Sequence, residues 1–417
     1  MDRPDAPIRN HRVDRRFPRW RELRPLIRLA PPAISLERRL ERATTIADLR
    51  SMAARRAPRA VFDYVAGGAG DELSMARAVR AFARVEFHPK TFRDVSEVSA
   101  GTTILGEEAS LPLVLAPTGL TRMMHHSGEP AIARAAARAG LPYTLSTMGT
   151  TAPEEVIAVE PIGARWFQLY MWRDRGRTEA LIDRVAEAGF RTLVLTVDVP
   201  VAGDRRRDVR NGLAMPPALR WRSFVDGALH PSWWFDLLTT EPLRFAAHAE
   251  AGEVLEDVID RTFDPAVSLD DLSWLRSRWT RTLVVKGVVR VDDARELAPR
   301  GVDGLVVSNH GGRQLDRSVT PLEVLPEIVE AVGGQVEVFV DGGVRSGADV
   351  VAAIGLGAKA AMIGRAYLYG LMAGGERGVD RALAILRDDV VRTMRLLGVR
   401  SLDELDASAV TLRDDAR

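Results

Sequence analysis

None of the 417 residues is a cysteine, and this absence excludes several classes of protein. Disulfide scaffolds, thiolate zinc sites, iron–sulfur clusters and cysteine nucleophiles all require that residue. Lysine is nearly as scarce, because only Lys90, Lys286 and Lys359 stand among 58 basic residues and arginine supplies the rest. A lysine at a chemically important position of this chain therefore needs a specific explanation.

Long apolar runs and a large net charge are missing as well. No stretch approaches the roughly 18 uninterrupted apolar residues of a membrane span, and the N-terminus lacks the basic-then-apolar pattern of a secretory signal. The formal net charge is +1, which gives no overall attraction to nucleic acid. We therefore expect a globular, cytoplasmic protein without a nucleic-acid partner.

Positive charge is concentrated at the N-terminus, where residues 1–60 hold 16 arginines and 7 acidic residues. We interpret residues 1–40 as a basic N-terminal arm and residues 41–417 as the main domain. Such an arm could bind an anionic membrane surface or a partner subunit. It could equally be a solvated segment that packs on its own protein.

Eight short apolar runs rich in β-branched residues recur along the main domain. They occupy residues 111–117, 142–147, 165–170, 192–198, 283–287, 304–310, 337–343 and 360–365. Continuous runs of this kind are typical of parallel strands buried on both faces, and helical patterns fill most of the intervals. Eight βα repeats predict an α/β fold, the (β/α)8 TIM barrel. A doubly wound sheet is the alternative, but no G-x-G-x-x-G motif follows the first strand.

Two segments do not follow the repeat. Residues 41–100 precede the first strand and predict an N-terminal helical segment that closes the barrel floor and one edge of the site. Residues 199–282 predict a long insertion after the fourth strand, with Trp, Phe and Leu gathered in residues 230–248. This insertion could be a lid, a subunit contact or a membrane-surface patch, or it could simply pack on the barrel.

Polar residues gather where the predicted strands end, and this rim is the catalytic face of a TIM barrel. A lone histidine is usually structural, but His310, Asp198 and Lys286 all fall on the same rim. Asp198 could hold the imidazole of His310 as a base, and the planar guanidinium of Arg313 suits a carboxylate. The run "GDRRRD" leaves Arg205 and its two neighbours equally eligible, and a charge run is ordinarily a solvated face.

The last two strands predict an anion site. The segments "DGGVRSGAD" and "IGRA" combine glycines, arginines and the start of a helix. Backbone N–H groups at such positions approach a ligand closely, and TIM barrels commonly bind phosphate after strands seven and eight.

The segment "SNHGGRQLD", residues 308–316, carries a resemblance to a known family. It is similar to the signature of the FMN-dependent 2-hydroxy acid oxidising enzymes, which include glycolate oxidase, flavocytochrome b2, mandelate dehydrogenase and lactate monooxygenase. The resemblance covers residues 44–408, nearly all of the chain outside the arm. Segments such as "FDYVAGGAGDE" and "TVDVPVAGDRRRDVRNG" resemble most closely the respiratory L-lactate dehydrogenases of actinobacteria.

The resemblance implies roles for the matching positions of this chain. Its implied catalytic residues are the base His310, its partner Asp198, Tyr170 and Arg205. Its implied substrate-binding residues are Tyr64, Arg313, Arg205 and Tyr170. Its implied FMN-binding residues are Pro117, Thr118, Gly119, Ser146, Gln168, Thr196, Lys286, Ser308, Asp341, Gly342, Gly343, Arg345, Gly364 and Arg365. Lys286 would lie beside flavin N1 and O2, where a compact point charge explains a lysine in an arginine-rich chain.

Three departures from the family pattern bear on function. Many members have alanine at the position of Gly119, and a glycine there opens space beside flavin N5, as in lactate monooxygenase. Met148 stands where glycolate oxidase has tryptophan, which indicates a different substrate pocket. The arm is too short for the heme domain of flavocytochrome b2 and lacks a suitable pair of histidines.

The expected function is FMN-dependent oxidation of a small L-2-hydroxy acid, first of all L-lactate to pyruvate, without a metal. Electrons would pass to a quinone or another carrier at the inner face of the cell membrane, and the family favours a homotetramer. One alternative is an oxygen-using lactate monooxygenase or 2-hydroxy acid oxidase, and another is a dehydrogenase of a larger acid such as mandelate. An FMN isomerase of phosphorylated substrates and a non-catalytic flavin-binding protein are further alternatives.

Overall fold

The structure, a computed structural model, describes residues 16–24, 35–160, 163, 165–213, 221–246 and 263–414. The chain divides into two units, Met1–Arg42 and Ala43–Arg417. The first unit contains α1 (Trp20–Leu23) and α2 (Leu36–Arg42). The second unit holds the barrel and every residue of the candidate site. Parts of the predicted arm, residues 1–15 and 25–34, lie outside the described residues.

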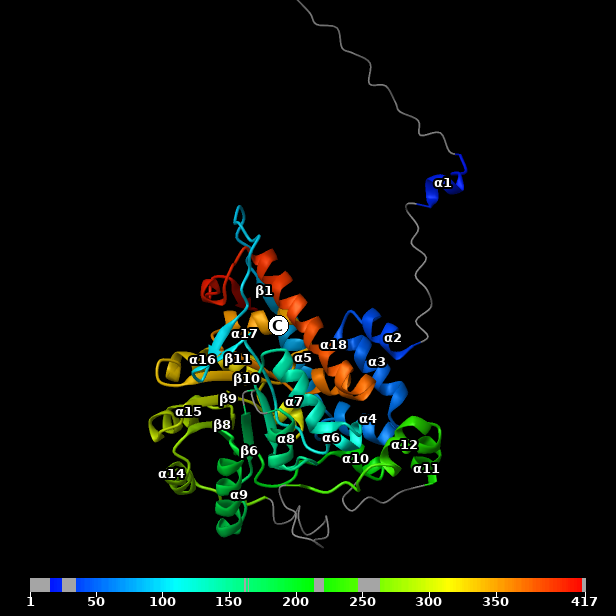
Figure 1. Ribbon diagram of the computed structural model, residues 1–417. Helices are drawn as coiled ribbons and strands as arrows, with labels where there is room; N and C mark the ends of the chain where they lie inside the picture. Colours follow the sequence, from blue (N-terminus) through cyan, green and yellow to red (C-terminus); the bar gives the residue numbers. More distant parts are fainter. Residues whose placement is uncertain are drawn as a thin grey trace, which may run out of the picture. The chain divides into compact units, whose positions relative to one another are not determined.

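Eight parallel strands form a closed barrel in the second unit (Figure 1). They are β4 (Leu113–Leu115), β5 (Tyr143–Ser146), β6 (Arg165–Leu169), β7 (Thr192–Thr196), β8 (Thr282–Val288), β9 (Gly304–Val307), β10 (Glu337–Asp341) and β11 (Ala360–Ile363). Neighbours in sequence pair with one another, and β11 pairs with β4, with Ile363 opposite Leu115, to close the ring. The eight predicted strands and the TIM barrel are thus confirmed. Apart from β8, which extends one residue beyond its predicted end, the observed strands end earlier than predicted because the residues that follow them leave the sheet.

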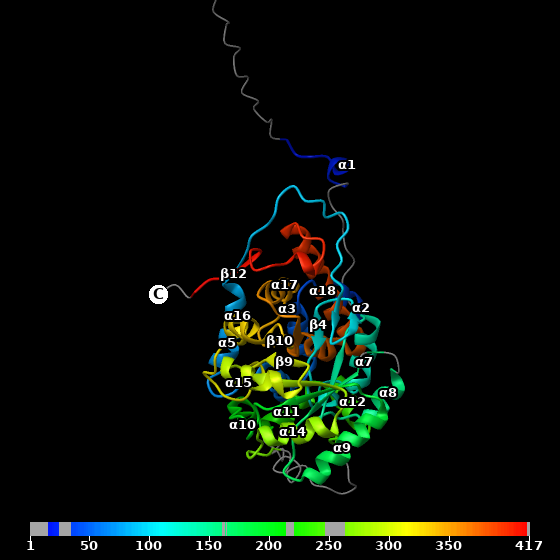
Figure 2. The ribbon, with the colours of Figure 1, turned by 90° about the vertical axis from the view of Figure 1, so that its left-hand side faces the viewer.

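Helices cover the outside of the barrel, as Figures 1 and 2 show from two sides. They are α6 (Thr121–Met124), α7 (Gly128–Arg138), α8 (Pro153–Val159), α9 (Arg175–Ala188), α15 (Val291–Leu297), α16 (Pro321–Val332), α17 (Gly347–Gly355) and α18 (Arg365–Leu397). Three 3-10 turns occur in the same unit, η1 (Ala298–Arg300), η2 (His310–Gly312) and η3 (Leu402–Glu404). The C-cap of α9 is Gly189, whose φ of 102° lies in the left-handed region that glycine adopts most readily.

The predicted N-terminal helices are present as α3 (Ile46–Arg56), α4 (Arg59–Ala66) and α5 (Leu73–Ala83). The prediction that they close the barrel floor is wrong. The floor is closed by a hairpin of β2 (Thr102–Ile104) and β3 (Glu107–Ala109). Ile104 is buried in one cluster with Trp166 and Phe339, and the N–H of Leu105 donates to Glu337, which begins β10. The hairpin offers only a short apolar tip, which the sequence pattern does not reveal.

A second small sheet was also missed. Strand β1 (Val85–Phe87) pairs antiparallel with β12 (Val410–Leu412), so that a segment preceding the barrel lies beside one that follows it. Each strand has three residues, too few for a period-2 pattern to be recognised.

The long insertion after the fourth barrel strand is present between β7 and β8. It contains α10 (Arg206–Arg210), α11 (Trp221–Ala228), α12 (Pro231–Leu238) and α14 (Leu269–Arg278). Residues 214–220 and 247–262 of the insertion are outside the described residues. Within the described parts of the chain, no helix is both long enough and apolar enough to span a membrane.

Candidate active site

A cavity of about 380 Å³ lies at the carboxyl ends of the barrel strands, a volume typical of small-molecule sites. The alternation of side chains along each strand builds it. Trp166 and Val284 belong to the apolar layer deep in the barrel. Two residues further along the same strands stand Gln168 and Lys286, which form the polar layer above it. The apolar layer therefore supports the polar one from below.

His310 lies on the cavity wall and makes a defined contact with Asp198. Its Nδ1 lies 2.9 Å from Oδ1 of Asp198, which follows β7, and the carboxylate lies directly behind the wall. Burial raises the pKa of Asp198, but the charge and hydrogen bond of His310 outweigh it and leave that pKa lowered. An ionised Asp198 accepts the Nδ1 proton, so the neutral imidazole keeps a lone pair on Nε2.

The backbone at η2 is left-handed over three consecutive residues. His310, Gly311 and Gly312 have φ values of 59°, 61° and 74°. A Cβ on Gly312 would lie 2.7 Å from the backbone nitrogen of Met75, so a side chain does not fit there. The carbonyl of Gly312 accepts a bond from the N–H of Ala69, at 2.9 Å. The glycines thus allow the loop that carries His310 to pack against the segment after α4.

Two arginines flank the ring of Tyr64 at the cavity edge. The guanidinium carbons of Arg313 and Arg205 lie 4.9 Å and 5.4 Å from the ring centroid. Of the three consecutive arginines, only Arg205 lines the cavity. Arg206 pairs with Asp71 and Asp204, and Arg207 pairs with Asp63 and Glu72. The structure therefore distinguishes residues that the sequence run left equivalent.

Two further residues complete this cationic edge. The buried ring of Tyr170 packs edge-on against Phe263, with centroids 5.2 Å apart. Burial and the charge of Asp198 raise the pKa of Tyr170, so its hydroxyl stays a donor. Asp208, which the sequence did not single out, lines the cavity 3.5 Å from Arg205, and burial raises its pKa.

Lys286 is buried at the base of the cavity. Its Nζ lies 2.7 Å from Asp341 and donates to the hydroxyl of Ser308 at 2.8 Å. Burial lowers the pKa of Lys286, but Asp341 and Asp198 outweigh it, so the pKa is raised and the lysine remains a cation. Ser308 also accepts a bond from the backbone N–H of His310, so one hydroxyl links both residues.

Several polar atoms around this layer are buried and have no hydrogen-bond partner among the described residues. They are Nε2 of Gln168, Oγ1 of Thr196 and one carboxylate oxygen of Asp341. Buried polar groups are normally hydrogen-bonded, and unsatisfied ones cost about 1–3 kcal/mol each. An amide donor, a hydroxyl and a carboxylate beside a lysine match the polar edge and the ribityl hydroxyls of a flavin.

Two arginines are partly buried at the ends of the last two strands. Arg365 donates to the carbonyls of Val65, Gly67 and Gly311, and Arg345 donates to that of Val344. Neither pairs with a carboxylate in the described chain. Burial, Arg313 and Arg345 lower the pKa of Arg365 to about 9, and burial lowers that of Arg345.

These two guanidiniums lie close to the N-terminus of α18 and to the Gly342–Gly343 turn. A Cβ on Gly343 would lie 2.3 Å from the carbonyl oxygen of Ala78. Buried cations without a carboxylate partner need an anion, and a phosphate fits both the charge and the helix end. The cavity therefore suits FMN, with its flavin edge and its phosphate at opposite ends.

The structure changes the interpretation of Gly119. A Cβ on this residue would lie 2.7 Å from Cβ of Met148 and 2.9 Å from its carbonyl oxygen, both too close. The N–H of Leu120 also donates to that oxygen at 3.0 Å. Packing against Met148 thus explains the glycine without any requirement for space beside a flavin.

Most residues predicted from the sequence meet at the one cavity. Those that line it are Tyr64, Pro117, Thr118, Gly119, Ser146, Tyr170, Thr196, Arg205, Lys286, His310, Arg313, Asp341, Gly342, Gly343, Arg345, Gly364 and Arg365. Asp198, Gln168 and Ser308 are buried behind its wall.

Sequence reasoning missed three further residues. Asp208 and Phe263 line the cavity, and the hydroxyl of Tyr367 lies 2.6 Å from that of Thr118. Asp208 follows the three arginines directly, which was the available signal. Tyr367 and Phe263 give none, because nothing in the sequence places them near the rim.

Comparison with known proteins identifies the family. The model of the FMN-dependent dehydrogenase family matches residues 53–412 of this chain. The chain belongs to the FMN-dependent dehydrogenase family. Its cofactor is accordingly FMN.

Curated relatives in this family cover nearly the whole chain. A Mycobacterium tuberculosis protein provisionally named an L-lactate dehydrogenase is 56% identical over 400 residues, which are 96% of this chain and 97% of that protein. L-Lactate dehydrogenase of Caulobacter sp. is 43% identical over 88% of this chain and 98% of its own. Human 2-hydroxyacid oxidase 1 is 38% identical over 89% and 97%.

Solved structures of the family share the fold. The monotopic membrane protein (S)-mandelate dehydrogenase matches with a TM-score of 0.86 and 36% identity, over 89% of this chain and all of that chain. A mandelate oxidase matches with a TM-score of 0.77 and 37% identity, over 90% of this chain and all of that one.

Proposed function

We propose that this protein catalyses the FMN-dependent oxidation of L-lactate to pyruvate. The observation that carries the proposal is the His310–Asp198 contact of 2.9 Å beside Arg313, Tyr64 and Arg205 on one cavity wall. This arrangement sets a proton acceptor next to a cationic edge that suits a carboxylate. A 2-hydroxy acid presents both a hydroxyl and a carboxylate to such a wall.

His310 is proposed to accept a proton from the substrate, and Asp198 is proposed to hold the ring. The carboxylate fixes the tautomer with Nδ1 protonated and stabilises the imidazolium after proton uptake. Tyr170, whose pKa is raised by burial and by Asp198, stays a hydroxyl that can donate to the substrate oxygen. These three residues act on the hydroxyl end of the substrate.

Arg313, Arg205 and Tyr64 are proposed to bind the carboxylate end. Both guanidiniums lie over the ring of Tyr64, and these contacts restrict the conformations of the two arginine side chains before the substrate binds. Asp208 neutralises part of the charge of Arg205, at 3.5 Å, which keeps two close arginines tolerable in a buried place. Orienting both ends of the acid in this way favours reaction at the carbon between them.

The FMN site is proposed to use the remaining residues of the cavity. Gln168, Thr196 and Lys286 would hold the flavin, whose ring supplies the two-electron acceptor chemistry, with Ser308 orienting Lys286. Arg345 and Arg365 would hold the phosphate. The further contacts proposed are those of Pro117, Thr118, Gly119, Ser146, Asp341, Gly342, Gly343 and Gly364.

A panel of 2-hydroxy acids tests the substrate. We expect kcat/KM for L-lactate to exceed that for (S)-mandelate, because Met148 and Phe245 narrow the pocket. It should also exceed that for glycolate, which has no methyl group to bury against these apolar side chains. A higher kcat/KM for mandelate than for lactate would show that the preferred substrate is a larger acid. Mandelate is the second candidate because the similar solved structures are a mandelate dehydrogenase and a mandelate oxidase.

The electron acceptor is proposed to be a quinone or another carrier rather than oxygen. The steric account of Gly119 supports this choice, because it removes the main sequence argument for lactate monooxygenase or oxidase activity. Stopped-flow reoxidation of the reduced enzyme by a quinone and by air would decide between them. Fast reoxidation by air would contradict a dehydrogenase.

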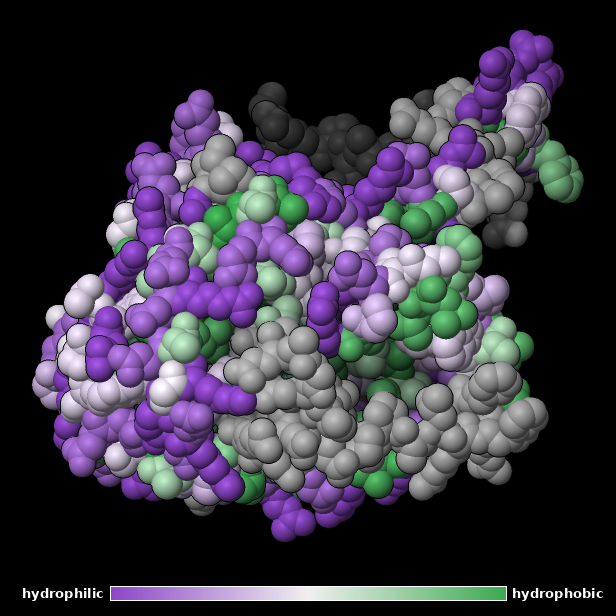
Figure 3. Space-filling view, turned by 60° about the horizontal axis from the view of Figure 1, so that its bottom comes forward, coloured by the Kyte–Doolittle hydropathy of each residue, from purple (hydrophilic) through white to green (hydrophobic). Residues whose placement is uncertain are grey.

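We further propose a homotetramer on the inner face of the cell membrane, attached peripherally through α11 and α12. Phe235 and Leu238 on α12 are 69% and 75% exposed, and Leu229, which directly follows α11, is 74% exposed. The face brought forward in Figure 3 carries hydrophobic atoms on its right-hand side, where Figure 1 places α11 and α12. Exposed apolar groups on short helices suit the interface of a lipid bilayer.

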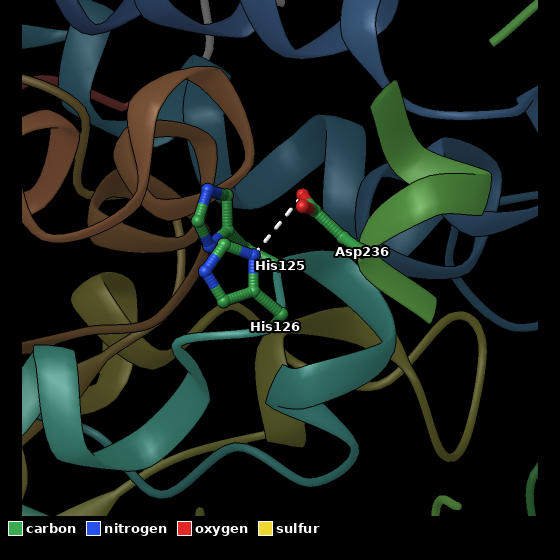
Figure 4. A group of neighbouring side chains, drawn as sticks. All are labelled: His125, His126 and Asp236. Atoms are coloured by element: carbon green, nitrogen blue, oxygen red, sulfur yellow. Dashed lines mark ion pairs between the residues drawn. The ribbon is translucent and has the colours of Figure 1, made fainter. Parts of the chain in front are cut away.

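The other side of α12 is fixed to the barrel unit by polar contacts. Asp236 lies 2.9 Å from Arg56 and 3.1 Å from Nδ1 of His126 (Figure 4), and the Trp233 indole donates to the carbonyl of Met123 at 2.8 Å. This side is therefore held while the apolar side stays free to meet a membrane.

The group shown in Figure 4 also resembles a metal site, since ligand atoms of His125, His126 and Asp236 lie within 4.8 Å of one another. Arg56 already neutralises Asp236 and would repel a cation. Burial, Arg56 and His126 lower the pKa of His125 to about 3, so this ring is neutral. We interpret the group as an anchor of α12.

A further inference from the structure

A second cavity of about 310 Å³ lies beside the central one, and no role described so far uses it. Its walls come from the end of β7, from β8, from residues 263–272 and from α15. Valine, leucine and proline dominate the lining. Val197, on its wall, is 40% exposed, so the cavity is reached from solvent along an apolar surface.

The two cavities share part of one wall. Tyr170, Thr196, Val199 and Phe263 line both of them. A ligand in the second cavity would thus be separated by these side chains from the place where FMN and the hydroxy acid react. This proximity is what a second substrate of the same reaction needs.

The two cavities differ in the charged side chains that line them, and therefore in the ligands that they favour. The ionisable carboxyl groups on the second cavity belong to Asp264, Asp293 and Glu296, and no arginine or lysine stands among its described lining residues. Asp264 pairs with Arg175 at 2.8 Å. Asp293 and Glu296 are exposed on α15, where they pair with Arg290 at 3.9 Å and with Arg300 at 3.3 Å, two arginines outside the lining. An anion such as lactate is therefore disfavoured here, and a neutral apolar molecule is favoured.

A bulge in β8 lets one strand serve both cavities. The register of β8 against β9 shifts between Lys286 and Val288. Lys286 lines the central cavity, and Gly287 and Val288 line the second one. Gly287 has a φ of 112°, and a Cβ there would lie 2.7 Å from Cβ of Asp198. Bulges are common next to active sites, where they redirect side chains.

We infer that the second cavity binds the electron acceptor, and that this acceptor is a neutral quinone. A quinone ring is flat, apolar and uncharged, as the lining requires. The reaction balances, because L-lactate gives up two electrons and two protons and a quinone takes up both to become a quinol. The inference rests on the proposed function, which supplies the donor.

Two separate cavities predict a specific inhibition pattern. Oxalate, an anionic and unreactive analogue of the acid, should compete with L-lactate for the arginines of the central cavity. It should not compete with a quinone that enters through the second cavity. If one cavity served both substrates in turn, oxalate would compete with the quinone as well, and this result would overturn the inference.

Filling the second cavity gives a direct test. Val267→Trp places a large ring in it from the loop before α14, and Val79→Trp, at an exposed site on α5, is the matched control. We expect V267W to raise KM for a short-tailed benzoquinone by about tenfold. The rate of anaerobic FMN reduction by L-lactate and the activity with ferricyanide, two ions of which accept the electron pair, should stay unchanged.

Other results separate the two proposals. If L-lactate does not reduce FMN in the wild type, the proposed function fails. If lactate reduces FMN in the wild type but V267W leaves the KM for the quinone unchanged, the inference fails. It also fails if V267W lowers the rate at which L-lactate reduces FMN. A second variant does not depend on packing: Glu296→Lys should lower KM several-fold for an anionic naphthoquinone sulfonate and leave the neutral quinone unaffected. Equal KM values of E296K and wild type for the naphthoquinone sulfonate would also overturn the inference.

Discussion

At the scale of single residues, the site is organised by charges that are paired in different ways. Lys286 and His310 each have a carboxylate partner, Asp341 and Asp198, within 3 Å. Arg345 and Arg365 have only backbone partners among the described residues. Paired charges hold a residue in place, whereas unpaired buried cations are prepared for an anion from outside.

The contact between His310 and Asp198 makes the free energy of unfolding depend on pH. The pKa of Asp198 is held below its ordinary 3.8, so its contribution is present above that pH and is lost as pH falls through the lowered value. We expect Asp198→Asn to cost about 1–3 kcal/mol at neutral pH, with the gap to wild type narrowing below about pH 3.8. Urea unfolding over this range measures it. A gap independent of pH would contradict the lowered pKa.

The contact between residue 119 and Met148 predicts a steric cost. Gly119→Ala should lower the free energy of unfolding by about 1–3 kcal/mol, because its Cβ overlaps Cβ and the carbonyl of Met148. Gly334→Ala is the matched control, since a Cβ there meets no atom within 4 Å. Calorimetry of both variants decides the matter. Equal stability of G119A and wild type would show that the glycine serves another purpose.

At the scale of elements, the barrel strands fix the site while the insertion adds side chains to its walls. Side chains two residues apart on a strand point to the same face, so Trp166 and Gln168 on β6 both point into the barrel. Trp166 packs in the apolar layer, and Gln168 belongs to the polar layer above it. The insertion supplies Phe263 and Arg205 to the cavity and carries α12 to the surface.

The exposed side of α12 predicts membrane binding. Replacing Phe235 and Leu238 together by serine should release the protein from vesicles of anionic phospholipid in flotation assays, because about 0.8 kcal/mol of affinity is lost per buried CH2 group. Leu396→Ser, an equally exposed position on α18, should change nothing. Activity with ferricyanide should persist in the double variant. Undiminished flotation would exclude α12 as the contact.

The elements also show what the sequence could and could not predict. The eight strands were predictable because a strand buried on both faces forms a continuous apolar run. The floor hairpin and the β1–β12 pair were missed because three-residue strands carry too little pattern. The link between Asp198 and His310 was anticipated because both follow barrel strands on the same rim, and the family resemblance implied it as well. The placement of Phe263 and Tyr367 depends on tertiary packing, which no local signal records.

At the scale of the whole molecule, two adjoining cavities with opposite charge preference can keep an anionic donor and a neutral acceptor apart. The central cavity is lined by Arg205, Arg313 and Lys286, and the second by Asp293 and Glu296. Such a division would let both substrates approach one cofactor without competing.

Cofactor removal should weaken the whole barrel unit. Without FMN, the partly buried Arg345 and Arg365 have no anion beside them, and Gln168 keeps an unsatisfied amide. Ligand at about 100 times its Kd stabilises a protein by about 2.7 kcal/mol, so we expect a clear rise in Tm when FMN is added back. Riboflavin, which lacks the phosphate, should restore much less. Equal effects of the two would contradict the phosphate site.

The central claim is that His310 accepts a proton from L-lactate, held by its neighbours, while the two electrons of the acid pass to FMN. Anaerobic mixing of the yellow holoenzyme with L-lactate tests it most directly, with the flavin absorbance followed in time and pyruvate measured afterwards. The account predicts rapid bleaching by L-lactate, none by D-lactate, and one pyruvate for each flavin reduced. His310→Gln should stay yellow and bleach slower by about 10²–10⁴-fold. Bleaching at equal rates by both enantiomers, or none by L-lactate, would contradict it.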